Sequence, residues 1–356
     1  MLGARGTIGA GPRTGKCSPE AKLANCARIV RGASAVAGHY DPPVRRTPLF
    51  LVAGACLGLA VVLAVLGVGE VPGALTDWQA LVLGVVQGLT ELLPISSSGH
   101  LILVPWLFDW DYLATHEDFN QTFDVALHLG TLVAVIAYFW RDIIVLVKAF
   151  VRSVARRAVE TPEERIAWLV AVATVPAALV GAAGESVIQD KLGEPWQIAI
   201  FLAVFGVLLW WVDKRSQQDR DVDELGWRHG LAIGAAQTLA LAPGVSRSGI
   251  TITAARHLRL SRDEAARLSF LLLIPIVFGA ALLKGVKDVA LGDLPPGWEG
   301  PFLVGTIAAA GSGLVAIWWL LGYVRRHDYA VFAIYRVCVA AIVLSLIALG
   351  IRDATF

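Results

Sequence analysis

Two short polar segments interrupt the long apolar stretches of this sequence, and they carry the side chains best suited to chemistry. The first, QGLTELLPISSSGH at residues 87–100, contains a glutamate, three consecutive serines and a histidine. The second, PGVSRSGIT at residues 243–251, places an arginine between two serines. An unpartnered polar group in hydrocarbon costs several kcal/mol. These groups must therefore satisfy one another or a ligand.

In the first segment, we expect a short helix that ends near Pro94 and is followed by a polar loop. Gln87 and Glu91 are four residues apart and share a face of that helix. The polar residues of the loop are Ser96, Ser97, Ser98 and His100. Helix capping accounts for one or two of the serines. It does not account for a glutamate and a histidine within a membrane, where ionisable residues are functional candidates by default.

The second segment has the groups that bind a phosphate. Arg247 is a forked cation, and the hydroxyls and backbone amides around it belong to Ser246, Ser248, Gly249 and Thr251. The alternative is an arginine that extends to the membrane interface. We expect that behaviour of Arg256, Arg259 and Arg262, which lie farther from the break. Together the two segments supply a carboxylate, a histidine, serines and an arginine, which suit phosphoryl transfer.

The composition is that of an integral membrane protein, so the lipid bilayer is an expected partner. Of the 356 residues, 56% are hydrophobic and 17% charged, against about 25% charged in an average soluble domain. The mean hydropathy is +0.65. A net charge of +1 gives no reason to expect nucleic acid as a partner. The four cysteines have neither a CxxC pair nor metal-ligand spacing, so we expect no disulfide framework and no zinc site.

The chain divides into three parts by composition. Residues 1–47 are rich in Gly, Ala and Arg without helical periodicity, which predicts a basic, disordered N-terminal tail. Residues 48–70 are apolar, follow an arginine pair and predict an extra transmembrane helix with its N-terminus inside. A cleaved signal peptide is the competing interpretation, but its apolar core is shorter, about 7 to 15 residues. Residues 71–356 form the main membrane domain.

Six further segments are long and apolar enough to cross a bilayer: 122–140, 166–184, 196–213, 268–284, 301–322 and 331–351. Basic residues concentrate in alternate connections, which places 141–165, 214–228 and 325–326 inside and 185–195 and 285–300 outside. The stretches 79–112 and 229–264 must then each begin and end on one side. Both contain a proline or glycine break, and broken backbone at membrane depth is tolerated only where it lines a protected cavity. We expect two re-entrant helical hairpins.

The two hairpins resemble each other in sequence. LVLGVVQGLTELLPISSSG begins at Leu81 and LAIGAAQTLALAPGVSRSG at Leu231, with seven identities in nineteen positions at an offset of 150 residues. Because the hairpins enter from opposite faces, this is an inverted-topology repeat whose halves meet at a site near the midplane. The expected fold is an all-α polytopic membrane protein with six core transmembrane helices, the two re-entrant hairpins and the extra N-terminal helix.

From Trp78 to the C-terminus, the sequence resembles the undecaprenyl-diphosphatase family, the bacitracin-resistance membrane phosphatases of bacteria. QGLTELLPISSSGH and PGVSRSGIT are similar to its two signature motifs, and FDVALHLGTLVAV and FLLLIPIVFGA extend the similarity. The resemblance implies removal of the terminal phosphate from the C55 isoprenoid diphosphate lipid, which regenerates the carrier for peptidoglycan synthesis. It also implies the hairpin fold, a divalent cation (Mg²⁺ or Ca²⁺) and a site in the plasma (inner) membrane that opens to the outer face.

Carried over by motif, the resemblance assigns roles to individual residues. The implied catalytic residues are Glu91, Ser97, His100 and Arg247, and the implied substrate-binding residues are Gln87, Ser96, Ser98, Ser246, Ser248, Gly249 and Thr251. Glu91 and Asp124 are the implied metal ligands. Position 87 is glutamine where some members have glutamate, so Glu91 remains as the essential acid. Either Ser97 or a water attacks phosphorus, and His100 or Glu91 takes a proton.

Two other functions remain compatible with these features. Inverted repeats with broken helices are the usual construction of secondary transporters. A flippase for the lipid monophosphate is a third hypothesis and is compatible with hydrolysis. A homodimer is one of the assemblies that the sequence permits, and nothing in the sequence fixes the oligomeric state. Residues 1–70 have no counterpart in the typical family pattern.

Overall fold

The structure is a computed structural model that describes residues 46–67, 75–110, 116–284 and 297–355. The chain divides into two compact units, residues 1–46 and 47–356, and the fold of the second is described here. The predicted basic tail, except for its last two residues, lies outside the described residues. The described residues form helices and no β-strand; one isolated bridge joins Arg220 and Leu260.

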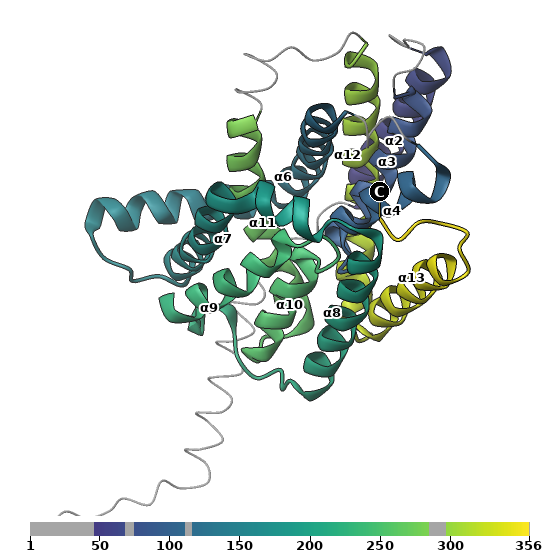
Figure 1. Ribbon diagram of the computed structural model, residues 1–356. Helices are drawn as coiled ribbons and strands as arrows, with labels where there is room; N and C mark the ends of the chain where they lie inside the picture. Colours follow the sequence, from purple (N-terminus) through teal and green to yellow (C-terminus); the bar gives the residue numbers. More distant parts are fainter. Residues whose placement is uncertain (1–45, 68–74, 111–115, 285–296, 356) are drawn as a thin grey trace, which may run out of the picture. The chain divides into compact units, whose positions relative to one another are not determined.

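Seven helices of the described chain are long and apolar enough to cross a membrane, as the sequence predicts. They are α2 (Arg46–Leu66), α6 (Glu117–Arg156), α7 (Pro162–Leu192), α8 (Pro195–Arg215), α11 (Arg262–Lys284), α12 (Glu299–Val324) and α13 (Ala330–Ala348) (Figure 1). The first is the extra N-terminal helix, and the other six are the predicted core helices. The polytopic all-α fold is confirmed.

Two of the predicted connections are largely helical. The basic segment 141–165 was expected to be a loop, but α6 continues through it to Arg156 and bends at Phe139, where φ is −103° and ψ is 15°. The segment expected outside at 185–195 is helical to Leu192 in α7. At 1.5 Å per residue, the 40 residues of α6 extend about 60 Å, roughly twice the hydrocarbon core. Hydropathy locates the part of a helix that lies in lipid, and charged residues with good helix propensity continue the helix beyond it.

Both predicted hairpins are present as pairs of short helices. The first consists of α3 (Asp77–Leu92) and α4 (Ser97–Phe108), and the second of α9 (Trp227–Thr238), the 3₁₀ turn η2 (Leu239–Leu241) and α10 (Arg247–His257). The longest of these arms has 16 residues, whereas a spanning helix needs about 20. Each hairpin therefore turns back within the chain's membrane-spanning core, as expected of a re-entrant element.

The two hairpins pack through equivalent glycines, as expected of an internal repeat. A β-carbon at Gly84 of α3 would lie 2.3 Å from the carbonyl oxygen of Gly305 in α12. A β-carbon at the equivalent Gly234 of α9 would lie 2.5 Å from the carbonyl oxygen of Ala173 in α7. Each hairpin thus presses its first arm against the backbone of one long helix. In Figure 1, α12 lies beside α3, and α7 lies near α9.

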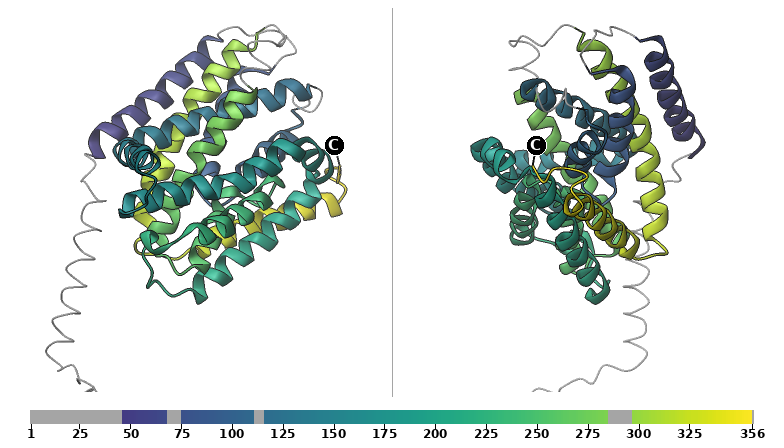
Figure 2. Two further views of the ribbon diagram at one scale, coloured as in Figure 1. Left: turned by 90° about the vertical axis from the view of Figure 1, so that its left-hand side faces the viewer. Right: turned by 45° about the vertical axis from the view of Figure 1, so that its right-hand side comes forward.

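The extra helix α2 packs against the first half of the core through small residues. Ala53, Ala60 and Ala64 are buried, and Ala60 and Ala64 form an apolar cluster with Leu81 of α3. The opposite face, including Leu51 and Leu66, is exposed, as expected of a helix that faces lipid. Figure 2 shows α2 running along α12.

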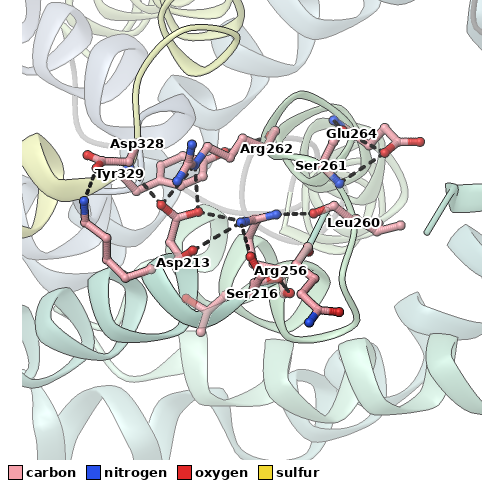
Figure 3. A network of polar contacts seen from close by, with 12 residues as sticks. Asp213, Ser216, Arg256, Leu260, Ser261, Arg262, Glu264, Asp328 and Tyr329 are labelled. Atoms are coloured by element: carbon pink, nitrogen blue, oxygen red, sulfur yellow. Dashed lines mark hydrogen bonds and ion pairs between the residues drawn. The ribbon is translucent and has the colours of Figure 1, made fainter. Parts of the chain in front are cut away.

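A buried ionic network joins the end of the second hairpin to three other helices, and it corrects one expectation from the sequence. Arg256 does not extend to an interface: it is fully buried and donates Nε to Asp213 Oδ1 at 2.7 Å and Nη1 to the Leu260 carbonyl (Figure 3). Arg262 donates Nε to both carboxylate oxygens of Asp213, at 2.9 and 3.0 Å. Arg259 is exposed and pairs with Asp219.

Arg256 stays buried because the carboxylate of Asp213 lies close to it, a partner that the sequence does not reveal. An arginine reaches for water when no acceptor lies closer. Here α8 supplies a buried carboxylate that also accepts from the Tyr329 amide at 3.3 Å, and charge-assisted hydrogen bonds hold the guanidinium inside. The network fixes α10 to α8, α11 and the start of α13.

Gly84→Ala tests the close packing of α3 on α12. The added methyl group would overlap the Gly305 carbonyl, and overpacking of this kind costs about 1 to 3 kcal/mol. We expect a lower midpoint of thermal unfolding in detergent. Gly279→Ala is the matched control, because no atom lies within 4 Å of its β-carbon position. Equal midpoints for the two variants would contradict the packing described.

Candidate active site

Each hairpin has a break between its two arms, at residues 93–96 in the first hairpin and 242–246 in the second. The two breaks have the same backbone geometry. Ser96 and Ser246 precede α4 and α10 with φ of 77° and 76°, a left-handed conformation that is uncommon for serine. Each side chain accepts a hydrogen bond from the backbone amide three residues later, at Gly99 and Gly249. Strained residues of this kind cluster at functional sites. The next residue in each break starts a helix, and it is Ser97 in one half and Arg247 in the other.

Glu91 is the residue on which both halves converge. Its Oε1 accepts hydrogen bonds from Arg247 Nε at 3.2 Å and Nη2 at 2.9 Å. Its Oε2 accepts the hydroxyl of Ser97. The three side chains are 5%, 12% and 8% exposed, so this is a nearly closed polar site. The structure brings together a serine hydroxyl, a carboxylate and a guanidinium, the three groups to which the family resemblance assigns one mechanism.

A third element fixes the direction of the arginine. Arg247 Nη1 donates to the Ser269 carbonyl of α11 at 2.8 Å. Thr251, one turn along α10, donates to the Ser269 hydroxyl at 2.8 Å and also bonds to the Arg247 carbonyl. The predicted binding residue Thr251 therefore lies at the site, and its hydroxyl holds α10 against α11.

The predicted serines connect the two breaks to each other. Ser96 accepts the Gly244 amide at 3.2 Å, and Ser248 donates to the Leu93 carbonyl at 3.1 Å. Ser246 and Ser248 share a hydrogen bond of 3.2 Å, and Ser96 and Ser98 one of 3.5 Å. These hydroxyls hold the turn of one hairpin against the turn of the other.

His100 lies beside α13. Its Nδ1 faces the Ser96 carbonyl at 2.7 Å, and its Nε2 lies 2.8 Å from the hydroxyl of Tyr335, on which the ring stacks. Since Nδ1 must donate to the carbonyl, Nε2 accepts from the tyrosine when the ring is neutral. Both ring nitrogens are thereby occupied.

His128 of α6 is the residue that the sequence prediction missed. Its Nε2 lies 3.5 Å from Glu91 Oε2, on the side of the carboxylate that Ser97 also contacts. Its Nδ1 faces the Asp124 carbonyl at 2.7 Å. A histidine in an apolar helix is itself a signal of function, and His128 stands in the FDVALHLGTLVAV segment. The family resemblance that this segment extends assigns no role to the side chain of His128.

The site offers limited ligands to a divalent cation. No cluster of three or more His, Cys, Asp or Glu side chains with metal-binding separations occurs within the described ranges. Mg²⁺, however, is often held by only one or two carboxylates together with substrate phosphates. To hold such an ion, Glu91 would have to exchange one of its contacts with Arg247, Ser97 or His128. Asp124 stands one turn before His128 on α6. Among the described residues, the buried amide of Gln87 has no hydrogen-bond partner, as expected of a group that binds a ligand or water.

Fold and site together define a polytopic membrane protein whose inverted repeat encloses groups suited to phosphoryl transfer. The family model described as bacitracin resistance protein BacA matches residues 80–342, and the chain belongs to this family. Proteins named undecaprenyl-diphosphatase are similar to it. Those of Moorella thermoacetica and Pelotomaculum thermopropionicum are each 44% identical, over 76% and 77% of this chain and 98% of their own lengths. That of Rubrobacter xylanophilus is 42% identical over 76% of the chain and 98% of its own.

Arg247→Lys tests the forked geometry at the site. A lysine has one nitrogen where Arg247 uses three, so it cannot bond to Glu91 and Ser269 and also bind a phosphate. Loss of one charge-assisted hydrogen bond costs about 1.5 to 3 kcal/mol. We expect kcat/KM for a diphosphate substrate to fall about 10- to 150-fold.

The matched control is Arg259→Ala, which removes an exposed arginine from the same return segment. It should leave kcat/KM unchanged. Turnover near that of the wild type in Arg247→Lys would rule out the forked contact as a catalytic requirement.

Proposed function

We propose that this protein hydrolyses undecaprenyl diphosphate to undecaprenyl phosphate and inorganic phosphate. In this role it recycles the carrier lipid for peptidoglycan synthesis and confers resistance to bacitracin. The names of its relatives support the substrate, and the family supports the resistance. The observation that carries the proposal is the contact of Glu91 with both Ser97 and Arg247, because it joins a nucleophile to a phosphate-binding cation.

The chemistry begins at the hydroxyl of Ser97. Glu91 accepts this hydroxyl as a hydrogen-bond donor, so it is placed to take the proton as Ser97 Oγ attacks the terminal phosphorus. The new Oγ–P bond forms as the bond from phosphorus to the bridging oxygen breaks, and undecaprenyl phosphate leaves. Water then attacks the phosphoserine, which releases inorganic phosphate and restores the serine hydroxyl. In the alternative, a water takes the place of Ser97 in a single step.

Arg247 retains donors for the substrate while it is held by the protein. A guanidinium has five N–H groups, and Arg247 uses three of them, two for Glu91 and one for Ser269. The remaining two are available to oxygens of the diphosphate. The ion pair with Glu91 also holds the guanidinium in one position, so its two unused N–H groups are oriented before the substrate binds.

We propose Glu91 and Asp124, with substrate phosphate oxygens, as the ligands of Mg²⁺ or Ca²⁺. The cation would neutralise charge on the phosphates during transfer. The contacts described above hold Glu91, Ser97 and Arg247 in place without the cation.

We propose that the protein lies in the bacterial plasma membrane with the site open to the outer face. The alternation of basic connections supports the assignment of the helix ends to the inside and the outside, and the outward opening of the site is what the family resemblance implies. A reporter fused after Arg326 should be cytoplasmic, and one fused after Phe356 should be external, since α13 lies between these positions. Reporter activity on the same side for both fusions would remove α13 from the set of spanning helices.

A carrier or flippase for the lipid monophosphate is the second candidate. The observation in its favour is the inverted repeat of broken helices, an architecture shared with transporters. Release of inorganic phosphate separates the two functions, because a carrier leaves the anhydride bond intact.

The decisive assay measures phosphate release from farnesyl diphosphate by purified protein, with divalent cation and with chelator. We expect release with cation and its loss with chelator. Glu91→Gln should lose at least about nine-tenths of the activity, because an amide cannot take the proton. The substitution also leaves Arg247 without its counter-ion, so insertion and folding of the variant are measured alongside its activity. Absence of release by the wild type with every divalent cation tried would favour transport.

A quenched single-turnover reaction with radiolabelled substrate separates the two nucleophiles. Labelled phosphoserine that is absent in Ser97→Ala supports serine attack. Absence of label from the wild type favours water.

A further inference from the structure

Arg336 of α13 is a fully buried arginine that bonds to both breaks at once. It donates Nη1 to the Pro94 carbonyl in the first break at 3.4 Å. It donates Nη2 to the carbonyls of Gly244 and Val245 in the second break, both at 2.9 Å. Its Nε donates to the Leu202 carbonyl of α8 at 3.0 Å. Nη2 also reaches the Phe201 carbonyl of α8 at 3.4 Å, so the guanidinium contacts both breaks and α8.

All of these acceptors are backbone carbonyls. Within the part of the chain that the structure describes, Arg336 forms no ion pair, although its side chain is 0% exposed. A buried charge without a counter-ion is costly, and carbonyls at the C-terminal ends of helices are among the few groups that offset it. Pro94 lies just beyond the end of α3, and Gly244 just beyond the end of η2, so Arg336 bonds to the turn that follows the first arm of each hairpin.

The catalytic groups depend on the separation of these two breaks. Glu91 and Ser97 flank the first break, and Arg247 directly follows the second. Moving one break against the other by an ångström would part the Arg247 fork from Glu91, a contact of 2.9 Å. Misplacement on that scale costs about 100-fold in rate.

We propose that Arg336 is a positioning residue that fixes the two re-entrant breaks against each other and so sets the distance between Arg247 and the Glu91–Ser97 pair. The inference rests on the proposed function for its assay. Its geometric basis, one guanidinium shared by two inverted halves and α8, is independent of the substrate. A lysine keeps the charge but has one nitrogen, and it cannot reach all three elements.

The first test compares Arg336→Lys with Arg256→Lys. Both replace a fully buried arginine, and both should lower the midpoint of thermal unfolding. Well below either midpoint, Arg336→Lys should lower kcat for farnesyl diphosphate about 10- to 100-fold with KM changed less than about threefold. Arg256→Lys, whose partner Asp213 belongs to the network of Figure 3, should keep kcat within about twofold.

A second variant moves Arg336 without replacing it. A β-carbon at Gly206 of α8 would lie 3.1 Å from the Arg336 β-carbon and 3.4 Å from its Nε. Gly206→Ala should therefore shift the guanidinium and lower kcat in the same sense as Arg336→Lys, even if the latter fails to fold. Gly322→Ala is the control, since nothing lies within 4 Å of its β-carbon position.

The outcomes separate this inference from the proposed function. A wild type that releases no phosphate removes the proposed function. An active wild type with equal kcat losses in Arg336→Lys and Arg256→Lys, or with kcat unchanged in Gly206→Ala, overturns the positioning role. A rise in KM in place of a fall in kcat also overturns it, because Arg336 would then act on substrate binding directly.

Discussion

The ion pair between Glu91 and Arg247 is the interaction on which the rest of the structure depends. It joins residues 156 positions apart, from two hairpins that contact each other at their breaks and between α3 and α10. Removing one partner of a buried pair leaves an uncompensated charge, at a cost of about 3 to 5 kcal/mol. The surrounding hydrogen bonds from Ser96, Ser248 and Arg336 hold the backbone of the breaks where this pair can form.

The repeat is symmetric in backbone and asymmetric in chemistry. Ser96 and Ser246 share a rare conformation, and Gly84 and Gly234 share a close helix contact. At the next equivalent positions the halves differ: Ser97 stands opposite Arg247, and Glu91 opposite Leu241. Gln87 and Gln237 remain equivalent, and neither amide has a hydrogen-bond partner in the part of the chain that the structure describes. One half therefore carries the serine and the carboxylate and the other the guanidinium, so the proposed site needs both halves.

Much of this arrangement is predictable from local sequence. Hydropathy finds the spanning helices, and the shared Gln, Ser and Gly pattern finds the hairpins and their convergence. The partners of buried charges are not predictable in this way. Asp213, His128 and Arg336 lie in apolar helices far along the chain from Arg256, Glu91 and the breaks, respectively. Their roles follow from helix packing, which no spacing rule encodes. The same limit explains why Arg256 was expected at an interface.

The added helix α2 changes how a long lipid can approach the site. In the family match, which begins at residue 80, nothing corresponds to this helix. Here its alanines cover Leu81 and contact the surface shared by α3 and α12, on the arm that carries Glu91. An isoprenoid tail cannot occupy the same face of α3. For the proposed isoprenoid substrate, this leaves the other sides of the first hairpin for the tail, and a helix outside the family match forms part of the surface beside that route.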